Sequence, residues 1–218
     1  MSALISDAEV VIVGGGEGAI LMEVLKHKTV KLATMIELDP MLIELSRQHL
    51  PGFSDCSNFE GRADNCFDDE LVTILHEDGI EWFVDRYGPT PTKEPVDPID
   101  VIIVDVLYPE DSTTRSNKVY QDANFWSSLM KSLSDEGVLS VVVGTCPNIN
   151  DPKPDIGFHK QREALFNILE GLPEVAAMFV YEEAHSGYDE PHSFLTVCKS
   201  ASCRNRWYAE SDAIDYQV

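Results

Sequence analysis

The chain has 218 residues, of which 44% are hydrophobic and 25% are charged, a composition typical of one ordered globular domain with a full core. Its 38 acidic residues against 16 basic ones give a formal net charge of −22, which disfavours nucleic acid and anionic membranes as partners and favours a cationic ligand. No apolar run is long enough to span a membrane. Solubility alone is the competing explanation for most of these carboxylates.

A glycine-rich turn between a strand and a helix is the first feature along the chain. We expect a strand at Val10–Val13, a helix at Ala19–Lys26 and a second strand at Lys31–Glu37. Four glycines form the turn, namely Gly14, Gly15, Gly16 and Gly18. Gly18 precedes Glu37 by 19 residues, close to the spacing of a nucleotide-binding βαβ unit whose acidic residue accepts hydrogen bonds from ribose hydroxyls.

The turn departs from the dinucleotide pattern GxGxxG, because Leu21 stands where the third glycine belongs. Glu17 adds a negative charge at the helix N-terminus, where a pyrophosphate would bind. The turn therefore favours an uncharged or cationic nucleoside, such as an adenosyl sulfonium compound. A tight turn that binds nothing is the alternative.

The rest of the chain alternates between further helices and strands. We expect Trp82 and Phe83 to lie in the core, and Asp78 and Asp105 each to follow a strand. The expected elements are a helix at Pro40–His49, a loop at 52–70, a strand at Leu71–His76, a helix at Ile80–Tyr87, a loop at Gly88–Pro98, a strand at Ile99–Val104, an irregular segment at 106–118, a helix at Asn124–Leu133, a turn at Gly137, a strand at Val138–Val143, a helix at Lys160–Leu169, and an antiparallel pair at Ala176–Tyr181 and Ser193–Cys198.

This alternation predicts an α/β fold with a doubly wound, mostly parallel Rossmann-like sheet and a closing antiparallel edge. Ligands of such sheets bind beyond the carboxyl ends of the strands, at the point where the strand order reverses. The glycine turn, Glu37, Asp78 and Asp105 all fall at those ends. We therefore expect them to converge on one site within a single domain at residues 1–218.

The cysteines and the N-terminus bear on the cellular compartment. The number of cysteines is odd and no CxxC pair occurs, which predicts a reduced compartment without a disulfide framework. No leader-like segment is present at the N-terminus, so we expect the cytoplasm. Cys56 and Cys66 do not match a zinc spacing with His49 or His76, so we expect no metal.

Several motifs taken together resemble the spermidine synthase family, the polyamine aminopropyltransferases. The turn Gly-Gly-Gly-Glu-Gly resembles that family's GGGDG, and Glu37–Pro40 resembles its E-x-D-P segment. Leu71–Phe83 resembles the strand that leads to its adenine-binding Asp-Gly turn. Asp100–Pro109 resembles the strand and loop that carry its catalytic D-x-x-D-P, and the residues from Val119 to Leu139 resemble the helix and strand that follow. The resemblance implies a class I methyltransferase-like fold.

The resemblance also implies a role for each matched residue. The glycine turn with Glu17 lies under the sulfur-bearing chain of decarboxylated S-adenosylmethionine, and Glu37, with Asp39 in the same acidic segment, binds the ribose. Asp78 accepts from the adenine amino group, and Gly79 allows close approach. Asp105 orients and deprotonates the attacking amine. For Asp105, a solvated residue that caps the next turn is the competing interpretation.

The acceptor side departs from the family pattern. Tyr108 stands where the family has its second motif aspartate, and Glu110 or Asp111 either substitutes for it or is an exposed loop charge. Tyr120 and Tyr188 either line the acceptor pocket or pack at the surface. The family's N-terminal β region has no counterpart here, and the chain ends at Val218, where the family usually continues. We therefore expect a chain truncated at both ends, with one domain of a longer protein or a variant with different chemistry as the alternatives, and a dimer in the full-length form.

Three functions are consistent with these features. The first is transfer of an aminopropyl group from decarboxylated S-adenosylmethionine to a diamine or polyamine. The second is an S-adenosylmethionine-dependent methyltransferase on the same fold, and the third is a non-catalytic adenosyl-nucleoside-binding domain. Glu17 and Asp105 would repel the carboxylate of intact S-adenosylmethionine, which favours the decarboxylated donor and hence the first function.

Overall fold

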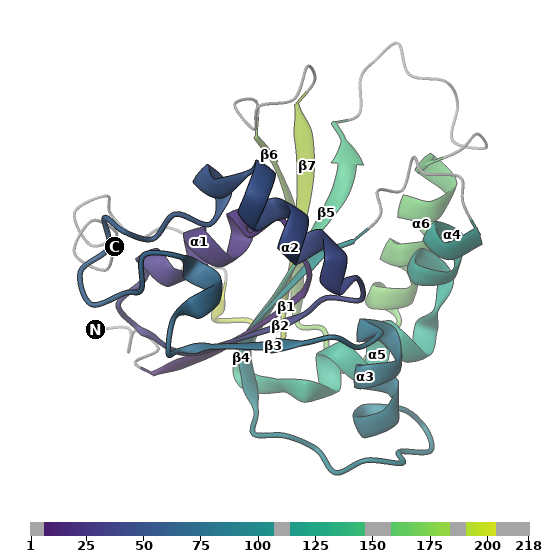
Figure 1. The fold of residues 1–218 in the computed structure, drawn as a ribbon. Coiled ribbons are helices and arrows are strands. Elements are labelled where there is room, and N and C mark those ends of the chain that lie inside the picture. Colours follow the sequence, from purple (N-terminus) through teal and green to yellow (C-terminus); the bar gives the residue numbers. More distant parts are fainter. Residues whose placement is uncertain (1–6, 107–113, 147–157, 184–190, 204–218) are drawn as a thin grey trace.

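The described residues of this computed structural model, 7–106, 114–146, 158–183 and 191–203, form a seven-stranded sheet with helices on both faces (Figure 1). The strand order is β3-β2-β1-β4-β5-β7-β6. The strands are β1 (Ala8–Gly14), β2 (Val30–Ile36), β3 (Val72–Leu75), β4 (Ile99–Asp105), β5 (Leu133–Thr145), β6 (Ala177–Glu183) and β7 (His192–Cys198).

The sheet confirms the predicted doubly wound, mostly parallel architecture. Strands β1 to β5 pair in parallel, and β7 runs antiparallel between β5 and β6. The chain winds outward from β1 through β2 to β3, and then returns to add β4 and β5 on the other side of β1. The order therefore reverses between β1 and β4, which is where a sheet of this kind opens a crevice for a ligand.

Three of the described helices begin at an aspartate whose side chain bonds their free N–H groups, whereas the first helix begins after Gly18 without a side-chain cap. The helices are α1 (Ala19–Lys26), α2 (Pro40–His49), α3 (Gly79–Tyr87), α4 (Thr114–Gln121), α5 (Ala123–Ser132) and α6 (Phe158–Glu170). The carboxylates of Asp39, Asp78 and Asp122 accept from backbone N–H groups in the first turns of α2, α3 and α5. Within the described part of the chain, no helix is both long enough and apolar enough to cross a membrane.

The core has two halves, one on each face of the sheet. Val11 and Val13 of β1 pack on the face covered by α3, α5 and α6, whereas Val10 and Ile12 pack on the face covered by α1 and α2 (Figure 1). Trp82 and Phe83 are buried in the first half, as predicted.

Two segments differ from the sequence-based expectation. Residues 114–118, expected to be irregular, begin helix α4, whose Val119 and Tyr120 are buried in the core. Strand β5 begins at Leu133 and runs through the turn expected at Gly137. This is possible because the register of its pairing with β4 shifts there: Ile99 pairs with Leu133, and Val101 with Val138.

Two disulfides are present, so the prediction of no disulfide framework is wrong. Cys56 is bonded to Cys66, and Cys198 to Cys203, whereas Cys146 is free. Local backbone pairing between the segments around Cys56 and Cys66 sets the first pair at a Cα–Cα distance of 5.2 Å. Sequence spacing alone did not reveal this pairing. The cytoplasmic localisation stays a prediction, and the cysteines no longer support it.

Replacing Phe83 by alanine tests the core. Phe83 is fully buried, with its ring edge-on to Trp82 at a centroid distance of 4.7 Å and to Phe125 at 6.4 Å. We expect Phe83→Ala to lower the free energy of unfolding by about 3–5 kcal/mol, measured by urea denaturation. Phe53→Ala, which truncates a 46% exposed ring, is the matched control and should cost less than half as much. Equal losses in the two variants would contradict this packing.

Candidate active site

The site is built around the contact between the glycine turn and the end of β4. Strands β1 and β4 are paired so that Gly14 lies opposite Asp105. Gly14 and Gly15 have φ values of +85° and +74°, a region that side chains disfavour, and a Cβ on Gly14 would collide with the carbonyl oxygen of Asp105. Glycine is therefore required where the two strands approach most closely.

Glu37, at the end of β2, is fixed by the turn itself. Its side chain is only 7% exposed, and it accepts hydrogen bonds from the backbone N–H of Gly16 at 3.1 Å and of Asp39 at 2.9 Å. These two bonds stabilise a buried carboxylate and hold it between the glycine turn and the start of α2. The carboxylate of Asp39 itself accepts from Met41 N at 2.9 Å, so it caps α2.

A cavity opens between the ends of β1, β2 and β3, with Asp78 as its charged residue. Asp78 follows β3 and accepts from Ile80 N at 2.9 Å at the start of α3. A Cβ on Gly79 would lie 2.5 Å from Val13 Cγ1, so the glycine lets α3 approach β1 closely. The residues that line the cavity are Val13, Gly14, Ile36, Leu38, Asp78, Gly79, Ile80, Val106, Val119 and Phe125. A narrow apolar space with one carboxylate suits a heteroaromatic base.

Three carboxylates gather beside the turn, and Glu17 and Glu37 contribute to a raised pKa of the third, Asp105. Burial raises the pKa of Asp105 from its ordinary value of 3.8 to about 7, and the charges of Glu17 and Glu37, with a hydrogen bond between the carboxyl groups of Asp105 and Glu17, act in the same direction. Asp105 therefore keeps its proton up to a pH near neutral. Perturbed carboxyl groups of this kind mark functional sites, because a cationic ligand relieves the repulsion between them.

The structure brings together most of the predicted site at one edge of the sheet. The glycine turn, Glu37, Asp78, Gly79 and Asp105 meet there, and their binding roles stay predictions. Tyr120 is buried, and its hydroxyl donates to the carbonyl of Val142 at 3.2 Å. Four candidate acceptor residues lie outside the described residues, namely Tyr108, Glu110, Asp111 and Tyr188.

Sequence reasoning missed the apolar walls of the cavity. Leu38, Val106, Val119 and Phe125 line it, and two of them directly follow a motif carboxylate, a position that could have indicated them. In the described ranges, no group of three or more His, Cys, Asp or Glu side chains is arranged to hold a metal ion. The absence of a metal requirement stays a prediction.

A family model described as the spermine/spermidine synthase domain matches residues 1–161, about three quarters of the chain. The chain belongs to the spermine/spermidine synthase family. This membership confirms the resemblance carried by the glycine turn and the acidic segments.

Individual relatives agree with this assignment. A polyamine aminopropyltransferase of Pyrobaculum calidifontis is 33% identical over 136 residues, which cover 62% of this chain and 41% of that protein. A spermidine synthase solved with the transition state analogue AdoDATO is 26% identical with a TM-score of 0.64, covering 88% of this chain and 55% of that one. The spermidine synthase of Thermotoga maritima shares the fold, with a TM-score of 0.66 at 23% identity over 97% of this chain and 59% of its own. The chain thus spans about two fifths of the length of the curated relatives it matches, and these structures confirm a methyltransferase-like fold.

The pKa of Asp105 predicts how stability depends on pH. The folded carboxyl, with a pKa of about 7, binds its proton more tightly than the unfolded one, so its contribution to stability is full below about pH 4 and is lost as pH rises through 7. Asp105→Asn removes this loss. The stability of the variant relative to the wild type should therefore rise between pH 4 and 7, by on the order of a few kcal/mol, and level off above that range.

Urea denaturation at several pH values, together with NMR titration of the Asp105 carboxyl, measures this effect. Glu17→Gln is the matched control: it removes a like charge, so the titration midpoint of Asp105 should fall. A stability difference between Asp105→Asn and the wild type that stays constant from pH 4 to 8 would contradict the raised pKa of Asp105.

Proposed function

We propose that residues 1–218 form the nucleoside-binding and catalytic domain of a polyamine aminopropyltransferase. The donor is decarboxylated S-adenosylmethionine, and the acceptor is a diamine or polyamine. The observation that carries the proposal is the cluster of the buried Glu37 with the partly buried Glu17 and Asp105 beside the glycine turn, an acidic cluster that favours a cationic ligand. Family membership and relatives named polyamine aminopropyltransferase support it.

The donor's adenosine fits the geometry at the ends of β1, β2 and β3. The adenine enters the apolar cavity with its amino group toward Asp78, and Ile36 and Leu38 contact the ring. The ribose hydroxyls donate to Glu37, whose carboxylate is held in place by Gly16 N. The sulfonium and its aminopropyl chain then extend over the glycine turn toward Glu17 and Asp105.

Charge selects the decarboxylated form of the donor. Among the described residues that line the cavity none is basic, and Glu17 with Asp105 would repel an α-carboxylate. The same two carboxylates attract the terminal ammonium of an aminopropyl group. Intact S-adenosylmethionine should therefore bind more weakly.

The reaction needs a deprotonated acceptor amine placed in line with the carbon next to sulfur. The amine lone pair forms the new C–N bond, the C–S bond breaks, and its electron pair goes to sulfur, which leaves as neutral methylthioadenosine. The proton released by the amine passes to Asp105, whose raised pKa makes it a better proton acceptor than an ordinary aspartate. Positioning of the two cations contributes much of the rate enhancement.

The acceptor is a cationic amine, consistent with a net charge of −22. Tyr108, Glu110, Asp111, Tyr120 and Tyr188 are the candidate acceptor contacts in this proposal. Lack of nucleic acid and membrane partners, a cytoplasmic location and a dimer in the full-length form are further predictions of the proposal.

Calorimetry and turnover assays test the proposal together. The chain should bind decarboxylated S-adenosylmethionine at least about tenfold more tightly than the intact compound, because one repelled carboxylate costs roughly 1–2 kcal/mol in a partly buried site. Tighter binding of the intact donor would reject aminopropyl transfer in favour of methyl transfer.

Variants separate binding from chemistry. With putrescine or spermidine as acceptor, Asp105→Asn should lower turnover by about 100-fold or more while methylthioadenosine affinity changes by less than about threefold. Glu37→Gln should do the reverse and weaken methylthioadenosine binding by about tenfold or more, because the amide replaces one of the two accepting oxygens with an NH2 group, which cannot accept from Gly16 N or Asp39 N. Undiminished turnover in Asp105→Asn would remove Asp105 from the mechanism.

A further inference from the structure

The segment between α2 and β3 is closed by a disulfide and packs under the proposed nucleoside site. We propose that the Cys56–Cys66 bond is a redox-sensitive clamp on the glycine turn, so that reduction of this bond weakens nucleoside binding. The proposal rests on the nucleoside site proposed above. Both sulfurs are fully buried among residues of α1, including Leu21 and Leu25.

Residues close in sequence to Cys56 and Cys66 contact the glycine at the N-terminus of α1. Gly18 ends the glycine turn with a φ of +93°, and a Cβ there would lie 2.8 Å from the Phe67 ring and 3.0 Å from Ser54 Cβ. Phe67 directly follows Cys66, and Cys66 N donates to the Ser54 carbonyl at 2.8 Å. A shift of either cysteine therefore moves the two side chains against which the turn rests.

The same segment also holds the other end of α1 and the end of α2. Arg62, inside the disulfide loop, donates through Nε to the carbonyl of Leu25 at 3.1 Å and through a terminal nitrogen to that of His27 at 3.2 Å. Arg47 of α2 forms a paired hydrogen bond with Asp68 and lies over the Phe67 ring at 5.0 Å. The disulfide thus closes a loop that fixes α1 at both ends.

The chemistry of the switch is thiol–disulfide exchange with a dithiol reductant. A thiolate of the reductant attacks one sulfur of the Cys56–Cys66 bond, the second sulfur leaves as a thiolate and takes a proton, and the second thiol of the reductant resolves the mixed disulfide. Two electrons and two protons pass to the protein, and the dithiol becomes a disulfide. Because the sulfurs are buried, attack requires local opening of residues 57–61, which are mostly exposed.

Thermodynamic linkage between nucleoside binding and reduction of the disulfide gives a second, independent test. If reduction weakens nucleoside binding, bound nucleoside must disfavour reduction by the same factor. Methylthioadenosine should therefore protect Cys56 and Cys66 from a dithiol, and leave the other disulfide unaffected.

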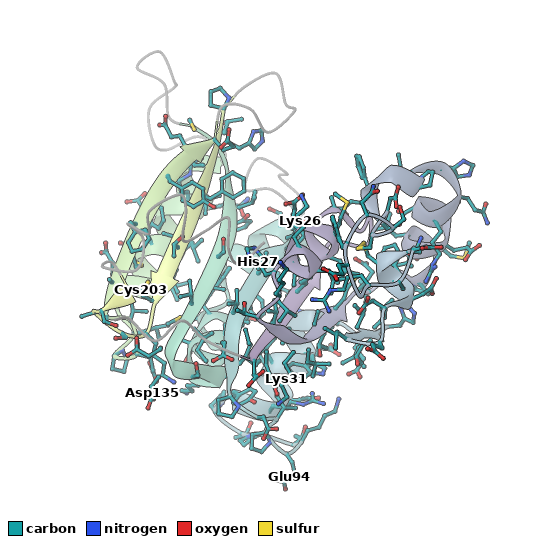
Figure 2. The ribbon with its side chains drawn as sticks, turned by 90° about the vertical axis from the view of Figure 1, so that its left-hand side faces the viewer. Lys26, His27, Lys31, Glu94, Asp135 and Cys203 are labelled. Carbon is teal, nitrogen blue, oxygen red and sulfur yellow. A yellow bond between two sulfur atoms is a disulfide. The ribbon has the colours of Figure 1, made fainter. Side chains whose placement is uncertain are left out.

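The second disulfide supplies a matched control. Cys198 ends β7 opposite Val138, at the amino-terminal part of β5 and away from the strand ends that form the site. In Figure 2, its partner Cys203 lies at one edge of the molecule, well apart from Lys26 and His27 at the end of α1. Loss of the Cys198–Cys203 bond should leave the glycine turn unchanged.

Calorimetry with methylthioadenosine tests the clamp on four samples: oxidised wild type, wild type reduced with dithiothreitol, Cys56→Ser with Cys66→Ser, and Cys198→Ser with Cys203→Ser. We expect about tenfold weaker binding in the reduced protein and in the Cys56/Cys66 double variant, and unchanged binding in the control double variant. Reductant should have no further effect on the Cys56/Cys66 double variant. Circular dichroism establishes that each sample is folded.

Two outcomes would overturn the clamp: equal affinity in the oxidised and reduced wild type, or five free thiols in protein purified without reductant. Failure of the oxidised wild type to bind methylthioadenosine would instead contradict the proposed function. Hydrogen exchange then still tests the clamp, because the amides of residues 14–18 should exchange faster on reduction only when the Cys56–Cys66 bond is present. Unchanged exchange there would refute it.

Discussion

The hydrogen bond from Gly16 N to Glu37 is the interaction on which the site depends, because it joins the first two parallel strands at their carboxyl ends. Glu37 is nearly excluded from water, and such a carboxylate is tolerated only when donors surround it. Two backbone N–H groups provide them, and both belong to segments that must lie where they do for the fold to form: the turn after β1 and the start of α2. The position of the carboxylate is therefore set by the backbone, which is the preorganisation that the proposed binding of a ribose would use.

This arrangement brings like charges close together, and their repulsion indicates which kind of ligand suits the site. Asp105 lies beside Gly14 because β1 and β4 pair in register, and the same register brings it close to Glu17 and Glu37. A fold selected only for stability would not bring three carboxyl groups together, one of them buried and two partly buried, because Glu17 and Glu37 both disfavour ionisation of Asp105. A cationic ligand would reverse the sign of this interaction, so carboxylates that disfavour one another would favour the sulfonium and the ammonium of the proposed donor. Burial of Asp105, with this repulsion added to it, raises the pKa of Asp105, and that shift can be measured.

Sequence reasoning succeeded where a local pattern determines the structure. The helices at Ala19–Lys26 and Pro40–His49 were predicted with the bounds that the structure gives, since a glycine turn, the Asp39 cap and Pro40 are all local signals. It failed where long-range pairing decides: Leu133–Gly137 became strand because β4 was available to pair with it, and residues 114–118 became helix because Val119 and Tyr120 pack into the core. The Cys56–Cys66 bond was missed for the same reason, because backbone pairing across a loop, and not cysteine spacing, brings the two sulfurs together.

The residues proposed to bind the nucleoside and those proposed to bind the acceptor amine lie in different parts of the chain. Every glycine and carboxylate proposed to contact the donor, from Gly14 to Asp105, lies in the continuous described stretch 7–106, whereas Val119 and Phe125 complete the apolar wall of the cavity from outside it. The candidate acceptor contacts lie beyond residue 106, and the hydroxyl of Tyr120 already donates to the carbonyl of Val142. The carboxylates proposed to hold a cationic nucleoside lie at these strand ends, so this chain should bind the donor's adenosine. The rate of transfer depends in addition on how an amine is held against Asp105, so affinity and turnover are independent properties of the chain and respond to different substitutions.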